Sequence, residues 1–255
     1  MDATQQGHVE VSVQDRIATI EFGHPLSNSL PSAILSKLAS TISETGARED
    51  VLVIILKSAG ERAFCAGASF DELSSIEDLD TGKEFFMGFA RVINACRTCG
   101  KLIIGRVQGK AVGGGVGVAS AVDYCLATKF AAVKLSELAV GIGPFVVGPA
   151  VERKVGTSAM SQLAINATEW RSAEWAAGHG LYAEVHEDAA SMDAAIATLA
   201  TKLAGSNPEA LAGLKKIFWE GTEHWATLLS ERAAMSGQLV LSDFSKNAIA
   251  AFKKK

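Results

Sequence analysis

Residues 107–127 read VQGKAVGGGVGVASAVDYCLA and place Gly113, Gly114 and Gly115 in succession, with Gly117 just beyond them. Glycine brings no functional group. The run is therefore explained either by a backbone bend that only glycine allows or by a group that comes very close to the backbone N–H groups. An apolar run precedes the glycines and a stretch of small residues follows them, which predicts the order strand, glycine turn, helix.

The flanking segments predict an α/β core, because strands and helices alternate along the first half of the chain. The helical patterns of this half cover residues 31–46 and 83–99, with a further short helix from about Gly115. After residue 157 the pattern becomes helical, and we expect the second half to be all-helical. The predicted strands are HVEVSVQ and RIATIEF, which form a hairpin, the buried runs VLVIILKS and KLIIGRVQG, and then DYCLAT and AAVKLS.

Composition excludes several classes of protein. The 255 residues are 48% hydrophobic and 20% charged, which is typical of a globular protein, and the formal net charge of −4 with scattered Lys and Arg argues against a nucleic-acid partner. No apolar run is long enough to predict a membrane span. The polar start MDATQQGHVEVSVQD lacks the pattern of a signal peptide, so we expect a cytoplasmic protein.

The common metal and cofactor motifs are absent from the sequence. There is no G-x-G-x-x-G, no P-loop, no G-x-S-x-G and no H-E-x-x-H, and the five histidines have no ligand spacing. Cys96 and Cys99 form a single C-x-x-C inside a helical pattern, where half-buried thiols are expected rather than a metal or redox site. We expect no metal and no cofactor of the protein's own.

Two loops share one design. ERAFCAGASFDEL, residues 61–73, and the stretch around the glycine run each follow a buried strand, precede a predicted helix and consist largely of Gly and Ala. Backbone N–H groups at such positions carry partial positive charge. One N–H from each loop could hold an oxygen that becomes negative during a reaction, which is an oxyanion hole. A single loop of this kind would be explained by turn formation alone, but two matching loops favour the catalytic interpretation.

These segments resemble the crotonase family, the enoyl-CoA hydratase/isomerase superfamily. AFCAGASFDEL is similar to the family's first oxyanion loop, VQGKAVGGGVGVASAVDYCLAT to the second and KLSELAVGIGP to its acid/base segment. SAEWAAGHGLYAEV and LSDFSKNAIAAFKKK are similar to later parts of the family, and the order is consistent from about His8 to the C-terminus.

The resemblance implies a spiral core of ββα turns over residues 1–190 and a helical C-terminal trimerisation region over residues 191–255. It implies an acyl-CoA thioester substrate, with coenzyme A as part of the substrate, and self-association into trimers or dimers of trimers. The thioester oxygen would be held by the N–H groups of Ala68 and Gly114, with the neighbouring glycines leaving room for the acyl chain. The remaining predicted contacts are His24, Ala66, Gly67 and Phe70 for coenzyme A, and Gly113, Gly117, Phe145 and Arg153 for the acyl group.

The sequence departs from the common hydratases in its acidic residues. Those enzymes carry two glutamates, and here the position of the first is Gly117, whereas the second matches Glu137. The apolar neighbours Leu135, Leu138 and Val140 predict that the Glu137 carboxyl is desolvated, which raises a carboxyl pKa towards the working pH. Glu137 is therefore the predicted catalytic acid and base.

The turn after Glu137 indicates which branch of the crotonase family the sequence resembles. GIGPFVVGPAVERKVG is similar to the branch that hydrates 3-methylglutaconyl-CoA in leucine breakdown, so reversible water addition to such an ester is the leading interpretation. A Δ3/Δ2-enoyl-CoA isomerase that uses one glutamate is the alternative, followed by a decarboxylase or hydrolase of CoA esters and by a scaffold or RNA-binding relative without catalysis. A glutaconyl-type carboxylate needs a partner, and Arg153, in the segment that follows Glu137, is the nearest plausible cation, with a surface charge on a helix as its alternative role.

Apolar residues of the C-terminal helices favour a subunit interface. These residues lie within a few turns of one another and exceed what a short helical tail needs for its own packing: Leu228, Leu229, Leu239, Val240, Leu241, Ile249 and Phe252.

Overall fold

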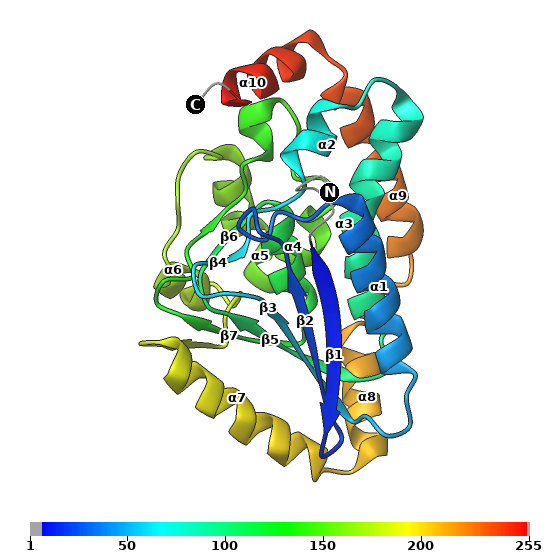
Figure 1. The fold of residues 1–255 in the computed structure, drawn as a ribbon, viewed down its shortest axis with the longest axis vertical. Helices are drawn as coiled ribbons and strands as arrows, with labels where there is room; N and C mark the ends of the chain where they lie inside the picture. Colours follow the sequence, from blue (N-terminus) through cyan, green and yellow to red (C-terminus); the bar gives the residue numbers. More distant parts are fainter. Residues whose placement is uncertain (1–6, 254–255) are drawn as a thin grey trace.

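The computed structural model describes residues 7–253, so residues 1–6, on which the expectation of a cytoplasmic protein partly depends, lie outside the described part. A six-stranded sheet runs in the order β1-β2-β3-β5-β7-β9, and a smaller sheet in the order β4-β6-β8 (Figure 1). The larger sheet consists of β1 (His8–Gln14), β2 (Ile17–Gly23), β3 (Val53–Ser58), β5 (Leu102–Val107), β7 (Tyr124–Thr128) and β9 (Glu184–His186). The smaller sheet consists of β4 (Ala63–Cys65), β6 (Lys110–Val112) and β8 (Val133–Lys134).

The predicted hairpin and buried strands are confirmed. β1 and β2 pair antiparallel through a tight turn at Asp15 and Arg16, both of which have positive φ. All later pairs of the larger sheet are parallel. Parallel strands are covered on both faces by helices, which is why β5 is buried along its whole length.

One expectation about the second half is wrong. The strand β9 lies there and pairs in parallel with β7, at the edge of the sheet. Three residues are too few to show a period of two, so the pattern could not distinguish this edge strand from a loop.

The helices form layers on either side of the larger sheet (Figure 1). The helix α7 lies along one face, where Met192, Ile196 and Ala200 pack against Val53 and Ile104. On the other side α1 packs against β1, β2 and α3, and α9 lies on α3. The helices are α1 (Ser32–Gly46), α2 (Phe70–Ser74), α3 (Leu79–Thr98), α4 (Gly114–Ala121), α5 (Gly148–Ile165), α6 (Ala173–Gly178), α7 (Ala189–Ala204), α8 (Pro208–Phe218), α9 (Trp225–Val240) and α10 (Asp243–Lys253), with the 3₁₀ turn η2 (Glu137–Val140).

Part of the apolar surface expected at a subunit interface is used within the chain. Leu229, Val240 and Ile249 are all buried against residues of this same chain. Leu239 and Phe244 remain exposed. The helices after residue 190 share the main core with the residues before it, since Leu229 belongs to the same buried cluster as the strands. The division of the chain into residues 1–190 and 191–255 stays a prediction. Within residues 7–253 no helix is both long and apolar enough to cross a membrane.

Candidate active site

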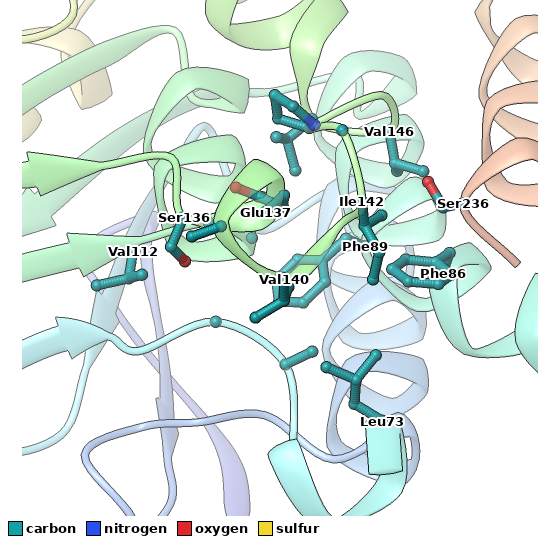
Figure 2. Close-up of a pocket in the computed structure, with 18 of the residues that line it drawn as sticks. Leu73, Phe86, Phe89, Val112, Ser136, Glu137, Val140, Ile142, Val146 and Ser236 are labelled. Atoms are coloured by element: carbon teal, nitrogen blue, oxygen red, sulfur yellow. The ribbon is translucent and has the colours of Figure 1, made fainter. Parts of the chain in front are cut away.

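A cavity of about 400 Å³ lies where the two glycine-containing loops meet η2 and the helices α2, α3 and α9. Its walls are mainly apolar, and Figure 2 shows Leu73, Phe86, Val140, Ile142 and Val146 converging on it. A cavity of this size with few polar groups is typical of a small-molecule site. Of the residues predicted from the sequence, it is lined by Ala66, Gly67, Ala68, Phe70, Gly113, Gly114, Glu137 and Phe145.

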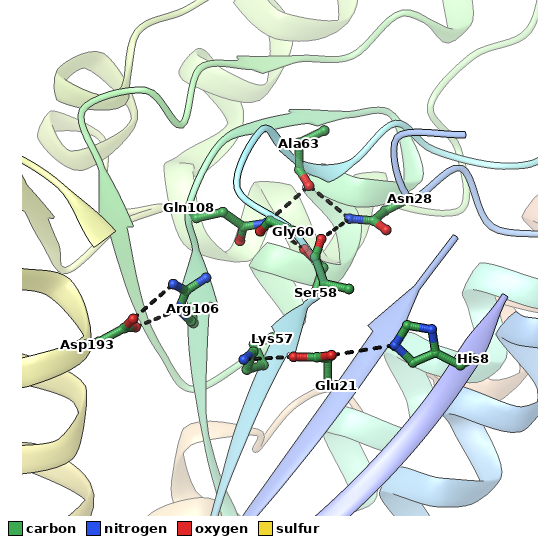
Figure 3. Close-up of polar contacts among 11 residues, drawn as sticks. His8, Glu21, Asn28, Lys57, Ser58, Gly60, Ala63, Arg106, Gln108 and Asp193 are labelled. Carbon is green, nitrogen blue, oxygen red and sulfur yellow. Dashed lines mark hydrogen bonds and ion pairs between the residues drawn. The ribbon is translucent and has the colours of Figure 1, made fainter. Parts of the chain in front are cut away.

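Hydrogen bonds from two buried amide side chains hold the first loop in place (Figure 3). Asn28 Nδ2 donates to Ala59 O and Ala63 O at 2.8 and 2.9 Å. Gln108 Nε2 donates to Ser58 Oγ, Gly60 O and Ala63 O. Both amides bind the backbone just before residue 66, so the start of the first loop is positioned by side chains from distant segments.

The second loop uses its glycines to admit protein side chains. A Cβ on Gly114 would collide with the ring of Phe89 from α3, and one on Gly115 would collide with Cys65. Gly113 adopts a positive φ of 53° at the start of α4, a conformation that L-residues rarely adopt, and faces Glu137. The expectation that the glycines next to Gly114 leave room for an acyl chain is corrected at Gly115, where Cys65 fills the space, whereas Gly113 lines the cavity. At Gly114 itself the space is filled by Phe89.

The two predicted oxyanion donors lie in adjoining loops. The amide nitrogen of Gly114 is 3.9 Å from the point that a Cβ on Gly67 would occupy, and Gly67 itself has a φ of 93°. Within residues 7–253 neither the Ala68 N–H nor the Gly114 N–H donates a hydrogen bond, although both residues line the cavity. Gly114 is also the first residue of α4, where free N–H groups point away from the helix. The pair is available to bind an oxygen atom.

Glu137 brings a carboxyl group to the same cavity. It opens η2 shortly after β8, and its Oε1 lies 3.0 Å from the position of a Cβ on Gly113. Its Oε2 is buried and has no hydrogen-bond partner within the described residues. Desolvation raises the pKa of this carboxyl to about 7. The predicted desolvation is found, but Leu138 is 48% exposed, so the cavity wall rather than this neighbour excludes water.

The turn after η2 fills the space beside Gly117, the position at which the common hydratases carry their other glutamate. Gly117 is buried in α4 and does not line the cavity. A Cβ there would come within 2.5 Å of Val147 Cγ1. The prediction that Gly117 contacts substrate is corrected. Val147 packs against Gly117 and itself forms part of the cavity wall.

Two further predicted residues lie elsewhere. The Arg153 guanidinium stacks 4.2 Å from the ring centroid of Trp219 and donates to Phe218 O, and Arg153 does not line the cavity. His24 is 7% exposed, and its Nδ1 accepts a hydrogen bond from the Leu26 N–H within the loop after β2. Arg153 is therefore not the cavity's cation, and the burial of His24 argues against its contact with coenzyme A.

The cysteines are free and buried, including Cys96 and Cys99 in and after α3. Burial raises the pKa of the Cys96 thiol to about 12, so it stays protonated and inert. Residues 7–253 contain no group of three potential metal ligands.

Several residues of the cavity wall were not predicted from the sequence. Phe85, Phe86 and Phe89 of α3 all line the cavity, and their spacing on one helix face was a signal that could have found them. Lys134 and Ser236 also line it. Nothing in the local sequence around Ser236 indicates a cavity residue, because α9 reaches the cavity only through its packing on α3.

Known proteins resemble this chain in sequence and in fold. Residues 12–255 match the family model described as enoyl-CoA hydratase/isomerase. A probable enoyl-CoA hydratase from Bacillus subtilis is 28% identical over 249 residues, covering 97% of this chain and 96% of that protein. A peroxisomal Δ(3,5)-Δ(2,4)-dienoyl-CoA isomerase from Arabidopsis thaliana is 27% identical, covering 88% of this chain and 84% of that protein. An enoyl-CoA hydratase structure from Bacillus halodurans superposes with a TM-score of 0.87 at 20% identity, covering 95% of this chain and 99% of that chain.

Proposed function

The chain belongs to the enoyl-CoA hydratase/isomerase family, and from this premise we propose that it transfers a proton on an enoyl-CoA thioester with Glu137 as its acid and base. One observation carries the proposal: among the described residues that line the cavity, Glu137 is the one carboxylic acid, and its pKa of about 7 lets it both accept and return a proton. The reaction needs no cofactor besides the coenzyme A of the substrate.

The oxyanion donors make that proton transfer feasible. When Glu137 removes a proton from the carbon between the thioester carbonyl and the double bond of a Δ3-enoyl-CoA, negative charge moves to the thioester oxygen. The N–H groups of Ala68 and Gly114 would hold this oxygen, which lowers the barrier for forming the enolate. The same carboxyl then delivers the proton to another carbon of the enolate, so the double bond moves and no atom is gained or lost.

Isomerisation of the Δ3/Δ2 type is the net reaction that this arrangement favours. Water addition in enzymes with two glutamates uses both carboxyls, and here Val147 fills the space beside Gly117. One carboxyl is sufficient for moving a proton between two carbons.

Hydration of a 3-methylglutaconyl-CoA-like ester is the second candidate. Its support is the turn PFVVGPAVERKVG, residues 144–156, which resembles the corresponding branch of the family. The terminal carboxylate of such an ester needs a cation. Since Arg153 lies elsewhere, Lys134 takes its place in this candidate, because it is the one basic residue among the described cavity residues.

A panel of enoyl-CoA esters in ¹⁸O-labelled water separates the reactions when mass spectrometry is combined with the ultraviolet absorbance of the conjugated thioester, which reports the position of the double bond. Isomerisation moves the double bond at constant mass, and hydration adds labelled water. Decarboxylation releases CO₂, and hydrolysis releases coenzyme A. Exclusive hydration with a preference for 3-methylglutaconyl-CoA over crotonyl-CoA that is lost in Lys134→Ala would establish the second candidate over the first. No turnover of any ester would refute proton transfer by Glu137.

We also propose that the protein self-associates into trimers or dimers of trimers. The support is apolar surface left on the C-terminal helices, where Phe244 is 67% and Met235 49% exposed. Light scattering at micromolar concentration tests this, and a stable monomer would refute it.

A further inference from the structure

Ser236 places an unpaired hydroxyl group in the wall of the cavity. The residue is 1% exposed and lines the cavity, yet its Oγ has no hydrogen-bond partner within the described residues. Figure 2 shows Ser236 beside Val146, on the side of the cavity opposite Val112 and Ser136. Burying a hydroxyl without a hydrogen-bond partner costs free energy. A ligand atom that enters the cavity and bonds to this hydroxyl would offset that cost.

Close packing of two helices holds this hydroxyl at the cavity. The next residue, Gly237, lies against α3, and a Cβ on Gly82 would be only 2.9 Å from Gly237 Cα. The glycine pair allows α9 to approach α3 backbone to backbone. Ser236 therefore cannot withdraw from the wall by a shift of its helix without breaking the Gly82–Gly237 contact.

We propose that Ser236 determines substrate specificity by hydrogen bonding to an oxygen atom on the acyl chain, which makes acyl-CoA esters with a hydroxyl or carbonyl group beyond the reacting carbons the preferred substrates. This inference rests on the proposed function, because it places the acyl chain in the same cavity as Glu137. The hydroxyl of Ser236 can donate to a carbonyl and can both donate to and accept from a hydroxyl.

The surroundings of Ser236 favour a neutral oxygen over a carboxylate. The walls near it are apolar, with Val146 and Phe86 among them. Arg232, one helical turn earlier in α9, donates to Phe145 O at 3.3 Å and does not line the cavity. One hydroxyl is not sufficient to compensate for the burial of an ionised carboxylate.

Binding of saturated CoA esters tests the inference without any turnover. The probes are matched acyl-CoA esters of increasing chain length that end in a hydroxyl, a methyl or a carboxylate group. The wild type is expected to bind the hydroxyl ester about fivefold more tightly than its methyl counterpart at the chain length that reaches Ser236. Ser236→Ala is expected to abolish this preference or reverse it in favour of the methyl ester.

Ser120→Ala is the matched control, because Ser120 is also fully buried but its hydroxyl donates to Val116 O within α4. It is expected to keep the hydroxyl preference even if its thermal stability falls. Three results would each overturn the inference: equal binding of hydroxyl and methyl esters at every chain length, a preference that survives Ser236→Ala, or tightest binding of the carboxylate ester. Failure of the proposed function shows separately, as an absence of proton exchange in enoyl-CoA esters that still bind.

Discussion

Val147 Cγ1 lies 2.5 Å from the point that a Cβ on Gly117 would occupy, so the turn after η2 closes the place where a second acidic side chain would reach the cavity. The absence of a carboxyl at Gly117 in α4 and the occupation of the adjacent space by Val147 thus go together. The chemistry of the site is limited by packing as well as by residue type.

Restoring the second carboxyl therefore requires two substitutions. Gly117→Glu alone is expected to lower the free energy of unfolding by about 1–3 kcal/mol, because it overfills the contact with Val147. Gly117→Glu combined with Val147→Gly is expected to recover part of that stability and to gain hydration of crotonyl-CoA. Chemical denaturation and a hydration assay check both effects. A single variant as stable as the wild type would show that the contact with Val147 is not restrictive.

Replacing the proposed acid and base is expected to stop turnover but not binding. Glu137→Gln keeps the shape of the side chain and removes its ability to exchange a proton. We expect kcat to fall by at least about a hundredfold while the Kd of a saturated acyl-CoA changes little. Steady-state kinetics and calorimetry measure the two quantities. Activity within a few-fold of the wild type would exclude Glu137 as the proton carrier.

The raised pKa of Glu137 also predicts how stability depends on pH. Between the ordinary carboxyl value of 4.5 and about 7, the folded protein keeps a proton on Glu137 that the unfolded chain has lost. The contribution of this residue to stability therefore falls as pH rises through that window, by at most about 3 kcal/mol. The stability of Glu137→Gln relative to the wild type should increase from pH 4.5 to 7 and then stay constant. Denaturation curves across this range test the prediction, which fails if the difference does not change with pH.

The glycine at the second oxyanion donor is expected to tolerate no side chain. In Gly114→Ala the added methyl group would collide with the ring of Phe89 and push it into the cavity. We expect a folded protein whose kcat/KM is at least about tenfold lower. The double variant Gly114→Ala, Phe89→Leu should recover part of this loss because the smaller side chain relieves the collision. If Gly114→Ala kept the kcat/KM of the wild type, the close contact between Gly114 and the ring of Phe89 would be contradicted.

Arg153 is expected to affect stability and not substrate choice. Its guanidinium covers Trp219 and binds the carbonyl of Phe218 at the end of α8. Arg153→Ala should lower the free energy of unfolding by about 1 kcal/mol and leave the ratio of kcat/KM values for 3-methylglutaconyl-CoA and crotonyl-CoA unchanged. Lys134→Ala is the comparison, because that lysine lines the cavity. A changed ratio in Arg153→Ala would return this residue to the substrate site.

The fold class, the two loops and the desolvated carboxyl of Glu137 could all be predicted from the sequence. These features depend on local patterns: apolar runs that form buried strands, Gly and Ala segments after them, and a glutamate among apolar residues. Each pattern fits within a short segment, so its structural consequence can be predicted without knowing what packs against it. The strand β9 was missed because three residues at a sheet edge carry no such pattern.

Long-range packing sets what surrounds the glycines and which side chains reach the cavity, so neither could be predicted from the sequence. Phe89, Cys65 and Val147 come from three separate elements to occupy the space beside Gly114, Gly115 and Gly117. Arg153 is close to Glu137 in sequence but lies on Trp219, whereas Ser236, far away in sequence, lines the same cavity as Glu137. The physical reason is that a close-packed interior is filled by whichever side chains the helices and strands bring together, and that arrangement depends on long-range packing rather than on distance along the chain.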